Sequence, residues 1–293
     1  MSNDNRPLIP VNPKGLDAIA KALLEGVEEK REEGLDSVDF LDSEKENYMI
    51  LEGREHTGTR KYQYGDLFVS LHRLGMNLSI ERIKSGLGFA VANTGQEQDG
   101  TNYIGNINWA QALKLNLGLG AKTLNPRQGI DFLVDLKDGI EGRKVLHYAS
   151  GKVIPNQVLQ RVFNEIVEVR NPYRAEWFDA DFKVVKGVLH INYDHQLGAK
   201  GVLTPRFSEP LEAYLDGSGV KVSLSEFNRQ GLATKKNDRG EILYWKPLPD
   251  NDSVARFSAD SYGTVLSCDG DATVVNSHLG VRQVRKKLRS KYE

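Results

Sequence analysis

The pattern of apolar residues changes near Val169, and this change constrains the fold more than any other feature of the sequence. Before it, apolar residues recur at helical spacing, as at Leu159, Val162 and Ile166. After it, short segments alternate apolar and polar residues between turns that carry Asp, Asn, Gly and Pro. These segments are KVVKGVLHINYDH, GVKVSL, EILYWKPL, VARF, TVLSC and LGVRQVR. We therefore expect an α+β protein, with helices in its N-terminal half packed on a twisted, mainly antiparallel, strand-rich C-terminal half.

Four helices are predicted, because in each case a capping residue or a first-turn proline precedes apolar residues at helical spacing. The predicted helices lie at residues 12–34, 109–118, 125–139 and 155–168. The first would form an N-terminal helical extension over residues 1–45. Residues 46–293 would then form one domain, with its most unusual segment at about 250–282.

Composition excludes several classes of protein. The 293 residues carry 39 Lys and Arg against 40 Asp and Glu, so the net charge of −1 gives no support to nucleic-acid binding. The single cysteine, Cys268, excludes an intramolecular disulfide framework. No apolar run approaches the ~20 residues that cross a bilayer, and residues 1–11 do not resemble a secretory signal. We expect no membrane span, and the localisation and the oligomeric state stay open.

The segment from Pro247 to Arg282 contains no Gln, Glu, Lys, Met or Trp, although these types form roughly a fifth of the chain. Ser, Asp, Gly, Thr, Asn, His and Tyr are frequent there, together with Val and Ala. Such side chains present many hydrogen-bonding groups, and Tyr adds a rigid apolar face, as in antibody paratopes. The segment therefore predicts either a binding surface or an ordinary pair of β-hairpins rich in Ser, Asp and Gly.

Two motifs resemble the formylglycine-generating-enzyme branch of the C-type lectin fold. The first is INWAQALKLNLGLGAKTLNPRQGIDFLVDL, residues 107–136, and the second is NSHLGVRQVRK, residues 276–286. The residues that occupy matching places in the first motif are Trp109, Ala110, Ala112, Leu124 and Pro126. Gln128 and Gly129 depart from the pattern, since that branch usually keeps an acidic residue and a tryptophan there. The resemblance implies a C-type-lectin-type fold.

The chain also resembles the archaeal and phage variable proteins of diversity-generating retroelements, which are built on this fold. NPYRAEWFDADF, residues 171–182, and the segment near the C-terminus carry this likeness. In such proteins, mutation of template adenines scatters asparagine-type codons into fifteen amino acids, and the five missing residue types are ones that such codons do not reach. The resemblance implies a noncatalytic protein that binds a protein or a surface ligand of unknown identity through a hypermutated face.

A surface that tolerates random substitution has to be exposed and carried by a backbone that other residues hold. The predicted ligand-binding residues are Ser258, Asp260, Ser261, Tyr262, Gly263, Val265, Ser267, Asp269, Gly270, Thr273, Val274, Val275, Asn276 and His278. The predicted inward-pointing framework residues are Val254, Phe257, Ala259, Leu266, Leu279, Val281 and Arg282. Cys268 stays unassigned between these two sets. A wider core is predicted at Trp109, Leu133, Phe163, Trp245, Leu266 and Val281.

Two other functions stay open. One is an undiversified structural component of a surface or virion with the same fold. The other is an enzyme of the formylglycine-generating type, which the single cysteine disfavours because that chemistry uses a cysteine pair. No catalytic residue is therefore predicted.

Metal binding has little support in the sequence. His190, Asn192 and Asp194 would share one face of a strand while His195 points away, which suits a chelate poorly. Asp269 and Asp271 offer carboxylates for calcium, but their spacing matches no defined calcium loop. We therefore predict no metal or cofactor other than this weak calcium candidate. The segment at 56–75, with aromatic and basic residues interleaved, is interpreted as a scaffold strand and helix rather than as a nucleic-acid surface.

Overall fold

The computed structural model describes residues 42–198 and 201–287. The predicted helix at 12–34 lies outside the described residues, and so does most of the predicted N-terminal extension. Within the described part of the chain, no helix is long and apolar enough to cross a membrane.

Three of the predicted helices are confirmed. They are α3 (Trp109–Gly118), α4 (Pro126–Ile140) and α5 (Asn156–Val167). Both α3 and α4 begin with a capping box: Asn108 and Asn125 accept the backbone N–H three residues on, and Gln111 and Gln128 accept the backbone N–H of the cap. Three short helical segments were not predicted from the sequence, namely η1 (Asp42–Asn47), α2 (Leu78–Ile83) and η2 (Lys84–Gly86).

The cap of α3 yields a first prediction. Replacing Asn108 by alanine leaves the backbone N–H of Gln111 without its 2.9 Å acceptor. We expect the free energy of unfolding to fall by about 1 kcal/mol, measured by urea denaturation. Asn108→Ser is the matched control, because serine also caps helices and should keep most of this stability. Equal losses in both variants would show that the cap itself contributes nothing.

The strand-rich C-terminal half forms one eight-stranded sheet in the order β10-β11-β13-β12-β7-β8-β9, with β14 paired to β7 outside this path. Its strands are β7 (Arg174–Val185), β8 (Val188–Leu197), β9 (Leu203–Pro210), β10 (Ser218–Val222), β11 (Ile242–Trp245), β12 (Ser253–Asp260), β13 (Gly263–Asp271) and β14 (Leu279–Gly280). All neighbours pair antiparallel except β11 with β13 and β14 with β7. The predicted α+β class and the mainly antiparallel sheet are therefore confirmed.

A second sheet joins the two ends of the described chain. It has the order β1-β4-β15, with β1 at Tyr48–Leu51, β4 at Leu67–Arg73 and β15 at Arg282–Lys286. Two hairpins complete the strands: β2 (Arg54–His56) with β3 (Tyr62–Tyr64), and β5 (Asn93–Gln96) with β6 (Asn102–Ile104). The predicted helix within residues 56–75 is wrong. LFVSLHR buries every second residue, and this is the period of a strand.

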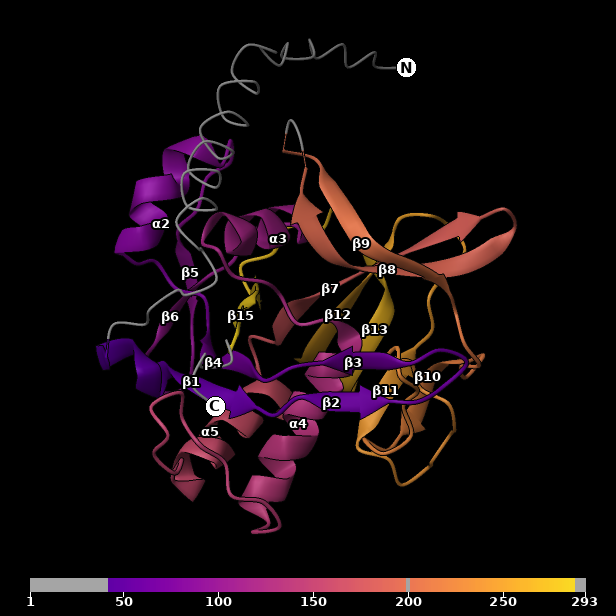
Figure 1. The fold of residues 1–293 in the computed structure, drawn as a ribbon, viewed down its shortest axis with the longest axis horizontal. Helices are drawn as coiled ribbons and strands as arrows, with labels where there is room; N and C mark the ends of the chain where they lie inside the picture. Colours follow the sequence, from indigo (N-terminus) through magenta and orange to yellow (C-terminus); the bar gives the residue numbers. More distant parts are fainter. Residues whose placement is uncertain (1–41, 199–200, 288–293) are drawn as a thin grey trace, which may run out of the picture.

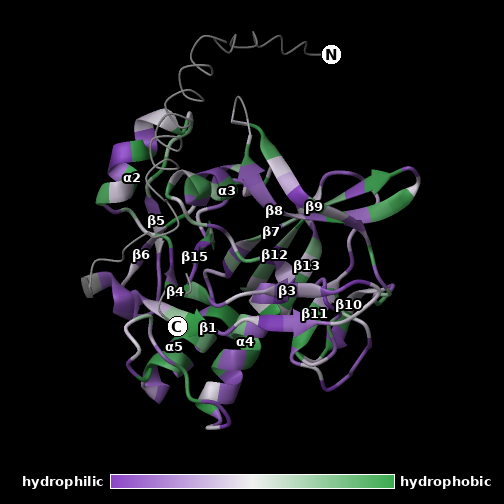
Figure 2. Ribbon diagram, viewed as in Figure 1, coloured by the Kyte–Doolittle hydropathy of each residue, from purple (hydrophilic) through white to green (hydrophobic). Residues whose placement is uncertain are grey.

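The large sheet is covered on both faces. Successive residues of β7 point to opposite sides, so Trp177 packs with α3 while Phe178 packs with α4 and α5. Figure 1 shows α3 on one side of β7 and β12, and α4 and α5 on the other. In Figure 2 the outer hairpin β2–β3 is mainly hydrophilic, which suits its place over the helices rather than within the core.

The framework prediction is confirmed, because all seven predicted framework residues are buried. In the wider core, Trp109, Leu133, Leu266 and Val281 are buried as predicted. Phe163 and Trp245 are only half-buried, and that part of the prediction is wrong. Phe163 lies at the flank of α5, whose inward face is taken by Leu159, Val162 and Ile166. Trp245 ends β11 and lies against Gly219 near the edge of the sheet.

Candidate functional site

The segment from Ser253 to His278 forms the β12–β13 hairpin and the loop that follows it. Asp260 pairs with Gly263, so Ser261 and Tyr262 form a two-residue turn at the tip. Tyr262 is 80% exposed. The hairpin therefore presents its tip to solvent while both of its strands lie inside the sheet.

The loop at 272–278 is held mainly through its own carbonyl oxygens. Four donors from three other parts of the chain bond to them: Asn106 N to Asn276 O (2.9 Å) and Trp109 N to Ala272 O (3.3 Å) around the start of α3, Thr94 Oγ1 to Ser277 O (3.0 Å), and Ala175 N to His278 O (3.1 Å). Every residue type offers a carbonyl oxygen. Within the described residues, the loop's own side chains add one bond to its backbone, from His278 N to Asn276 Oδ1 (2.8 Å), and most of its path is therefore held by groups that do not depend on side-chain identity.

Ten of the fourteen predicted ligand-binding residues are at least partly accessible. Four are exposed, namely Ser261, Tyr262, Thr273 and Val275. Six are half-buried, namely Asp260, Gly263, Asp269, Val274, Asn276 and His278. Val274 also packs against the core on the α3 side of the sheet. Nine of these residues lie at the hairpin tip or in the carbonyl-anchored loop, and Asp269 lies near the C-terminal end of β13.

The expected exposure of the other four residues is wrong, since Ser258, Val265, Ser267 and Gly270 are buried. Ser258 and Val265 pair directly on β12 and β13, and β12 is an interior strand flanked by β7. The hydroxyl of Ser267 donates to Asp269 at 2.6 Å. A Cβ on Gly270 would lie 2.9 Å from the carbonyl oxygen of Val254, which leaves no room for a side chain.

Gly263 is accessible but conformationally restricted. Its φ is +131°, a backbone conformation that residues with side chains rarely adopt. A Cβ there would also lie 3.3 Å from Leu243. Substitution at Gly263 would therefore strain the turn, and the accessible surface is better described without it.

Tyr173 joins the hairpin and the loop into one surface. Its ring lies 5.5 Å from that of His278, in an edge-on arrangement. Burial raises the pKa of Tyr173. The charge of the nearby Arg256 lowers this pKa, and the charge of the nearby Asp260 raises it, so charged residues of the β12–β13 hairpin as well as His278 of the loop lie near Tyr173. Within the described residues, the buried Nε of Arg256 has no hydrogen-bond partner. The centre of the surface thus holds a phenol and a guanidinium that the sequence analysis did not single out.

A signal for both residues was present in the sequence. Tyr173 belongs to NPYRAEWFDADF, and Arg256 belongs to the predicted strand VARF. Pairing of β12 with β7 places Arg256 opposite Trp177 and Ala259 opposite Arg174, next to Tyr173, and the pairing partner of a strand does not follow from its alternation.

Cys268 lies with the framework rather than with the surface. Its side chain is fully buried in the core cluster that contains Leu266 and Phe257. Burial raises the pKa of the Cys268 thiol well above its ordinary value. A buried, protonated thiol is a poor nucleophile, so Cys268 offers no reactive group at this surface.

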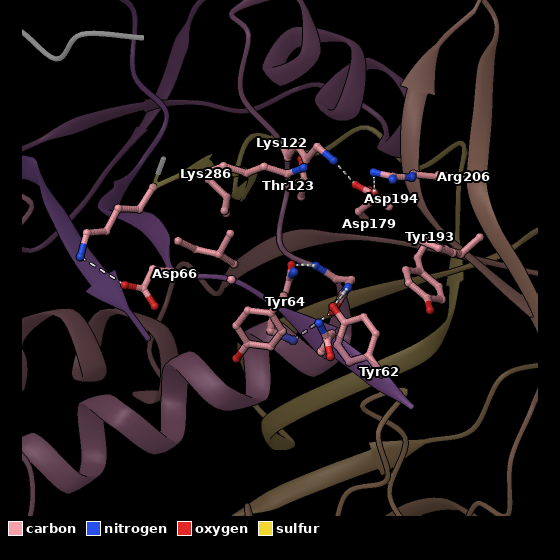
Figure 3. Close-up of a pocket in the computed structure, with 18 residues that line it drawn as sticks. Tyr62, Tyr64, Asp66, Lys122, Thr123, Asp179, Tyr193, Asp194, Arg206 and Lys286 are labelled. Carbon is pink, nitrogen blue, oxygen red and sulfur yellow. Dashed lines mark hydrogen bonds and ion pairs between the residues drawn. The ribbon is translucent and has the colours of Figure 1, made fainter. Parts of the chain in front are cut away.

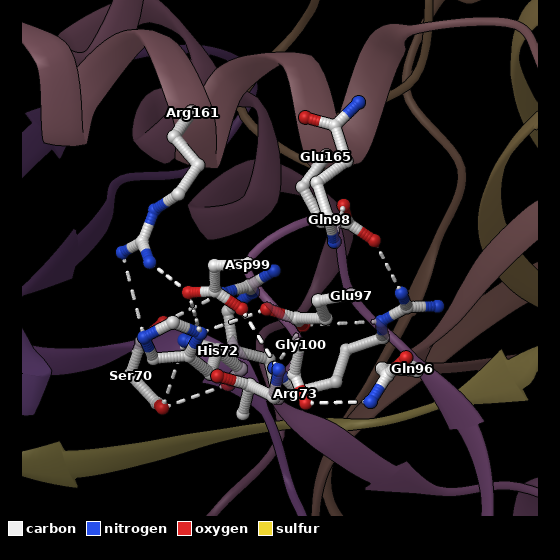
Figure 4. Close-up of polar contacts among 12 residues, drawn as sticks. Ser70, His72, Arg73, Gln96, Glu97, Gln98, Asp99, Gly100, Arg161 and Glu165 are labelled. Atoms are coloured by element: carbon white, nitrogen blue, oxygen red, sulfur yellow. Dashed lines mark hydrogen bonds and ion pairs between the residues drawn. The ribbon is translucent and has the colours of Figure 1, made fainter.

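One cluster of potential metal ligands exists among the described residues, and it was not predicted from the sequence. His72 Nδ1 lies 2.8 Å from a carboxylate oxygen of Glu97 and 3.7 Å from one of Asp99 (Figure 4). Arg73 bonds to Glu97, and Arg161 pairs with Asp99. Burial raises the pKa of Glu97, but the bond from His72 and the charges of Arg282 and Arg73 lower it to about 2. These carboxylates are already neutralised by protein cations, and the cluster is best described as an ion-pair network.

The candidate ligands named from the sequence form no such cluster in the described part of the chain. His195 is buried, with its Nδ1 bonded to Asp179 at 2.5 Å. Asp271 accepts bonds from the N–H and the hydroxyl of Thr273, and these bonds shape a turn. Among residues 42–198 and 201–287, no third carboxylate or histidine joins Asp269 and Asp271, so the calcium candidate gains no support.

Comparison with known proteins adds no assignment. No family model matches the chain, and no curated protein and no solved structure matches it. The function has therefore to be argued from the residues and their arrangement.

Proposed function

We propose that this chain is a noncatalytic ligand- or receptor-binding protein whose hypermutated surface, of the type found in diversity-generating retroelements, lies on the β12–β13 tip and the loop at 272–278. The observation that carries this proposal is the carbonyl anchoring of the loop. Because the anchoring groups on the loop are main-chain oxygens, side chains there can vary while the backbone stays in place.

The surface has the chemistry of a general-purpose binding face. Tyr262 offers an exposed aromatic ring, while Asp260, Asn276 and His278 offer donors and acceptors around Tyr173. Tyrosine with small polar residues supplies contact area at low cost in conformational entropy.

A C-type-lectin-type scaffold is the finer part of this proposal. Three features support it. First, β4 and β15 come from opposite ends of the described chain and pair antiparallel. Second, α3 and α4 follow one another in the sequence and lie on opposite faces of the large sheet. Third, the Leu-Gly-Val-Arg segment of the second motif forms β14 and leads into β15. Its Arg282 is buried against Glu176. Residues 279–282 of this motif are therefore buried in structural positions, whereas residues 276–278 lie in the loop.

Two libraries of the full chain test the proposal. The first randomises the exposed positions Ser261, Tyr262, Thr273 and Val275, and the second randomises the buried positions Ser258, Val265, Ser267 and Gly270. Most members of the first library should remain folded, because exposed substitutions usually change stability by less than about 0.5 kcal/mol. Most members of the second should unfold. Protease resistance during display measures both fractions, and equal misfolding would overturn the proposal.

Selection of the first library against unrelated proteins gives the functional readout. Folded variants with new specificities are expected, since a few central residues carry most of the energy of an interface. In a selected binder, restoring the original residues at positions 261, 262, 273 and 275 should abolish the new binding and shift thermal stability little. Failure to select any binder would favour an undiversified structural component. A template repeat and a reverse-transcriptase gene beside the coding sequence would separate the two functions independently.

A further inference from the structure

A pocket of about 320 Å³ lies away from the proposed binding face, and none of the fourteen predicted ligand-binding residues lines it. Five parts of the chain form its walls: the β2–β3 hairpin with the start of β4, the connection from α3 into α4, β7 through Asp179, the β8–β9 hairpin, and β15 with Lys287. Its volume falls at the lower end of the range typical of small-molecule sites, roughly 300–1,000 Å³. The pocket is shown in Figure 3.

One wall of the pocket is a continuous row of aromatic rings. The ring of Tyr62 lies 5.9 Å from that of Tyr64 and 5.9 Å from that of Tyr193. Tyr193 in turn stacks on Phe207 at 5.2 Å. The hydroxyls of Tyr64 and Tyr193 donate to Asp131 and Glu209, which holds these rings in place. Such a wall suits a flat ring, which gains stacking energy on aromatic faces.

The opposite side carries an excess of positive charge. In Figure 3, Lys122 and Lys286 lie along this side, and Arg206 lies between this side and the aromatic row, with its guanidinium 5.3 Å from the centre of the Phe207 ring. Lys122 and Arg206 share the single carboxylate of Asp194. For Lys286, the described part of the chain provides no ion-pair partner. The other two carboxylates of the lining are already paired, Asp66 with Lys287 and Asp179 with His195.

Neutral hydrogen-bond donors lie between the two sides. Tyr62 Oη accepts a 2.6 Å bond from Asn125 Nδ2, so its own hydrogen stays available to donate. Burial raises the pKa of Tyr62, which keeps this phenol protonated. Thr123 Oγ1 accepts from Asn116 at 2.8 Å and likewise keeps its hydrogen. These donors point to a ligand with acceptor atoms between its ring and its charge.

We propose that this pocket binds a small anion that carries a flat ring, either an aryl or nucleoside monophosphate or an aromatic carboxylate. The ring lies on the Tyr62–Tyr193–Phe207 wall, and the anionic group lies against Lys122, Arg206 and Lys286. A neutral sugar would leave the excess cations uncompensated. An apolar ligand would leave both the cations and the hydroxyl donors without partners, and both alternatives cost binding energy.

Isothermal titration calorimetry of the full chain tests this assignment with defined probes. The probes are adenosine monophosphate, phenyl phosphate and benzoate as ring-bearing anions, adenosine as the matched neutral ring, and inorganic phosphate as the matched ringless anion. At least one ring-bearing anion should bind at least about tenfold more tightly than adenosine and inorganic phosphate, since each of these lacks one half of the recognition. This affinity should fall as salt concentration rises. If a phosphate probe binds more tightly than benzoate, the anionic group of the ligand is a phosphate, and the reverse order indicates a carboxylate.

Two variants locate the binding. Lys286→Gln removes an exposed cation and Phe207→Ala removes a partly exposed ring, so neither should unfold the protein. Each should weaken binding of the ring-bearing anion by about tenfold. Lys235→Gln is the matched control, because it makes the same charge change at an exposed lysine outside the pocket lining. The assignment is overturned if no ring-bearing anion binds saturably, or if the two pocket variants bind as tightly as the control.

Discussion

Replacing Arg282 by alanine should lower the free energy of unfolding by about 3–5 kcal/mol, the cost of leaving a buried charge without its partner. Arg282 is 2% exposed. Its guanidinium donates to both carboxylate oxygens of Glu176, at 2.6 and 3.1 Å, and to the carbonyl oxygen of Ser70 at 2.8 Å. It thus ties β15 to β7 and to β4. Urea denaturation followed by circular dichroism measures the loss.

Two controls separate the buried ion pair from a general effect of removing arginine. Arg239 is exposed, and Arg239→Ala should change stability by less than about 0.5 kcal/mol. Arg282→Met combined with Glu176→Leu should recover part of the loss, because neither charge then stays buried alone. A loss for Arg282→Ala no larger than that for Arg239→Ala would mean that the pair contributes little.

The helices and strands could be predicted from the sequence because their signals are local. Asn108 and Asn125 mark the beginnings of α3 and α4, and the alternation in VARF and TVLSC identifies β12 and β13. The sheet order and the buried ion pairs could not be predicted. Glu176 and Arg282 lie 106 positions apart, and nothing near either residue identifies its partner.

The candidate surface could be predicted in part. Turn and loop positions such as Tyr262 and Thr273 are accessible, because connecting segments lie at the surface in most folds, independently of the order of the strands. Ser258 and Ser267 were expected at the surface because they are polar, yet both are buried. Alternation along a strand shows which residues share a face. It does not show that another layer covers that face as well.

The stability of the protein should also fall as pH rises from about 6.5 through 9, because of His195. This residue is 4% exposed, its N–H and Nδ1 bond to Asp179 at 3.0 and 2.5 Å, and its Nε2 lies 3.4 Å from Asp181. Burial lowers the pKa of His195, but the two carboxylates outweigh burial and raise it to about 9. Between the unfolded pKa, about 6.5, and the folded value, the folded protein holds a proton that the unfolded chain has released. Raising the pH therefore favours unfolding, by roughly 3 kcal/mol over the whole interval.

Urea unfolding at pH values from 6 to 9.5 measures this dependence, and histidine variants assign it. His195→Gln should be less stable than the parent at pH 6 and should show a much flatter pH profile, because the titrating group is gone. His190→Gln, a change at a half-buried histidine on the same strand, should keep the steep profile of the parent. If His195→Gln fell in stability as steeply as the parent between pH 6.5 and 9, another group would have to carry the pH dependence, and His195 would not be a buried imidazolium.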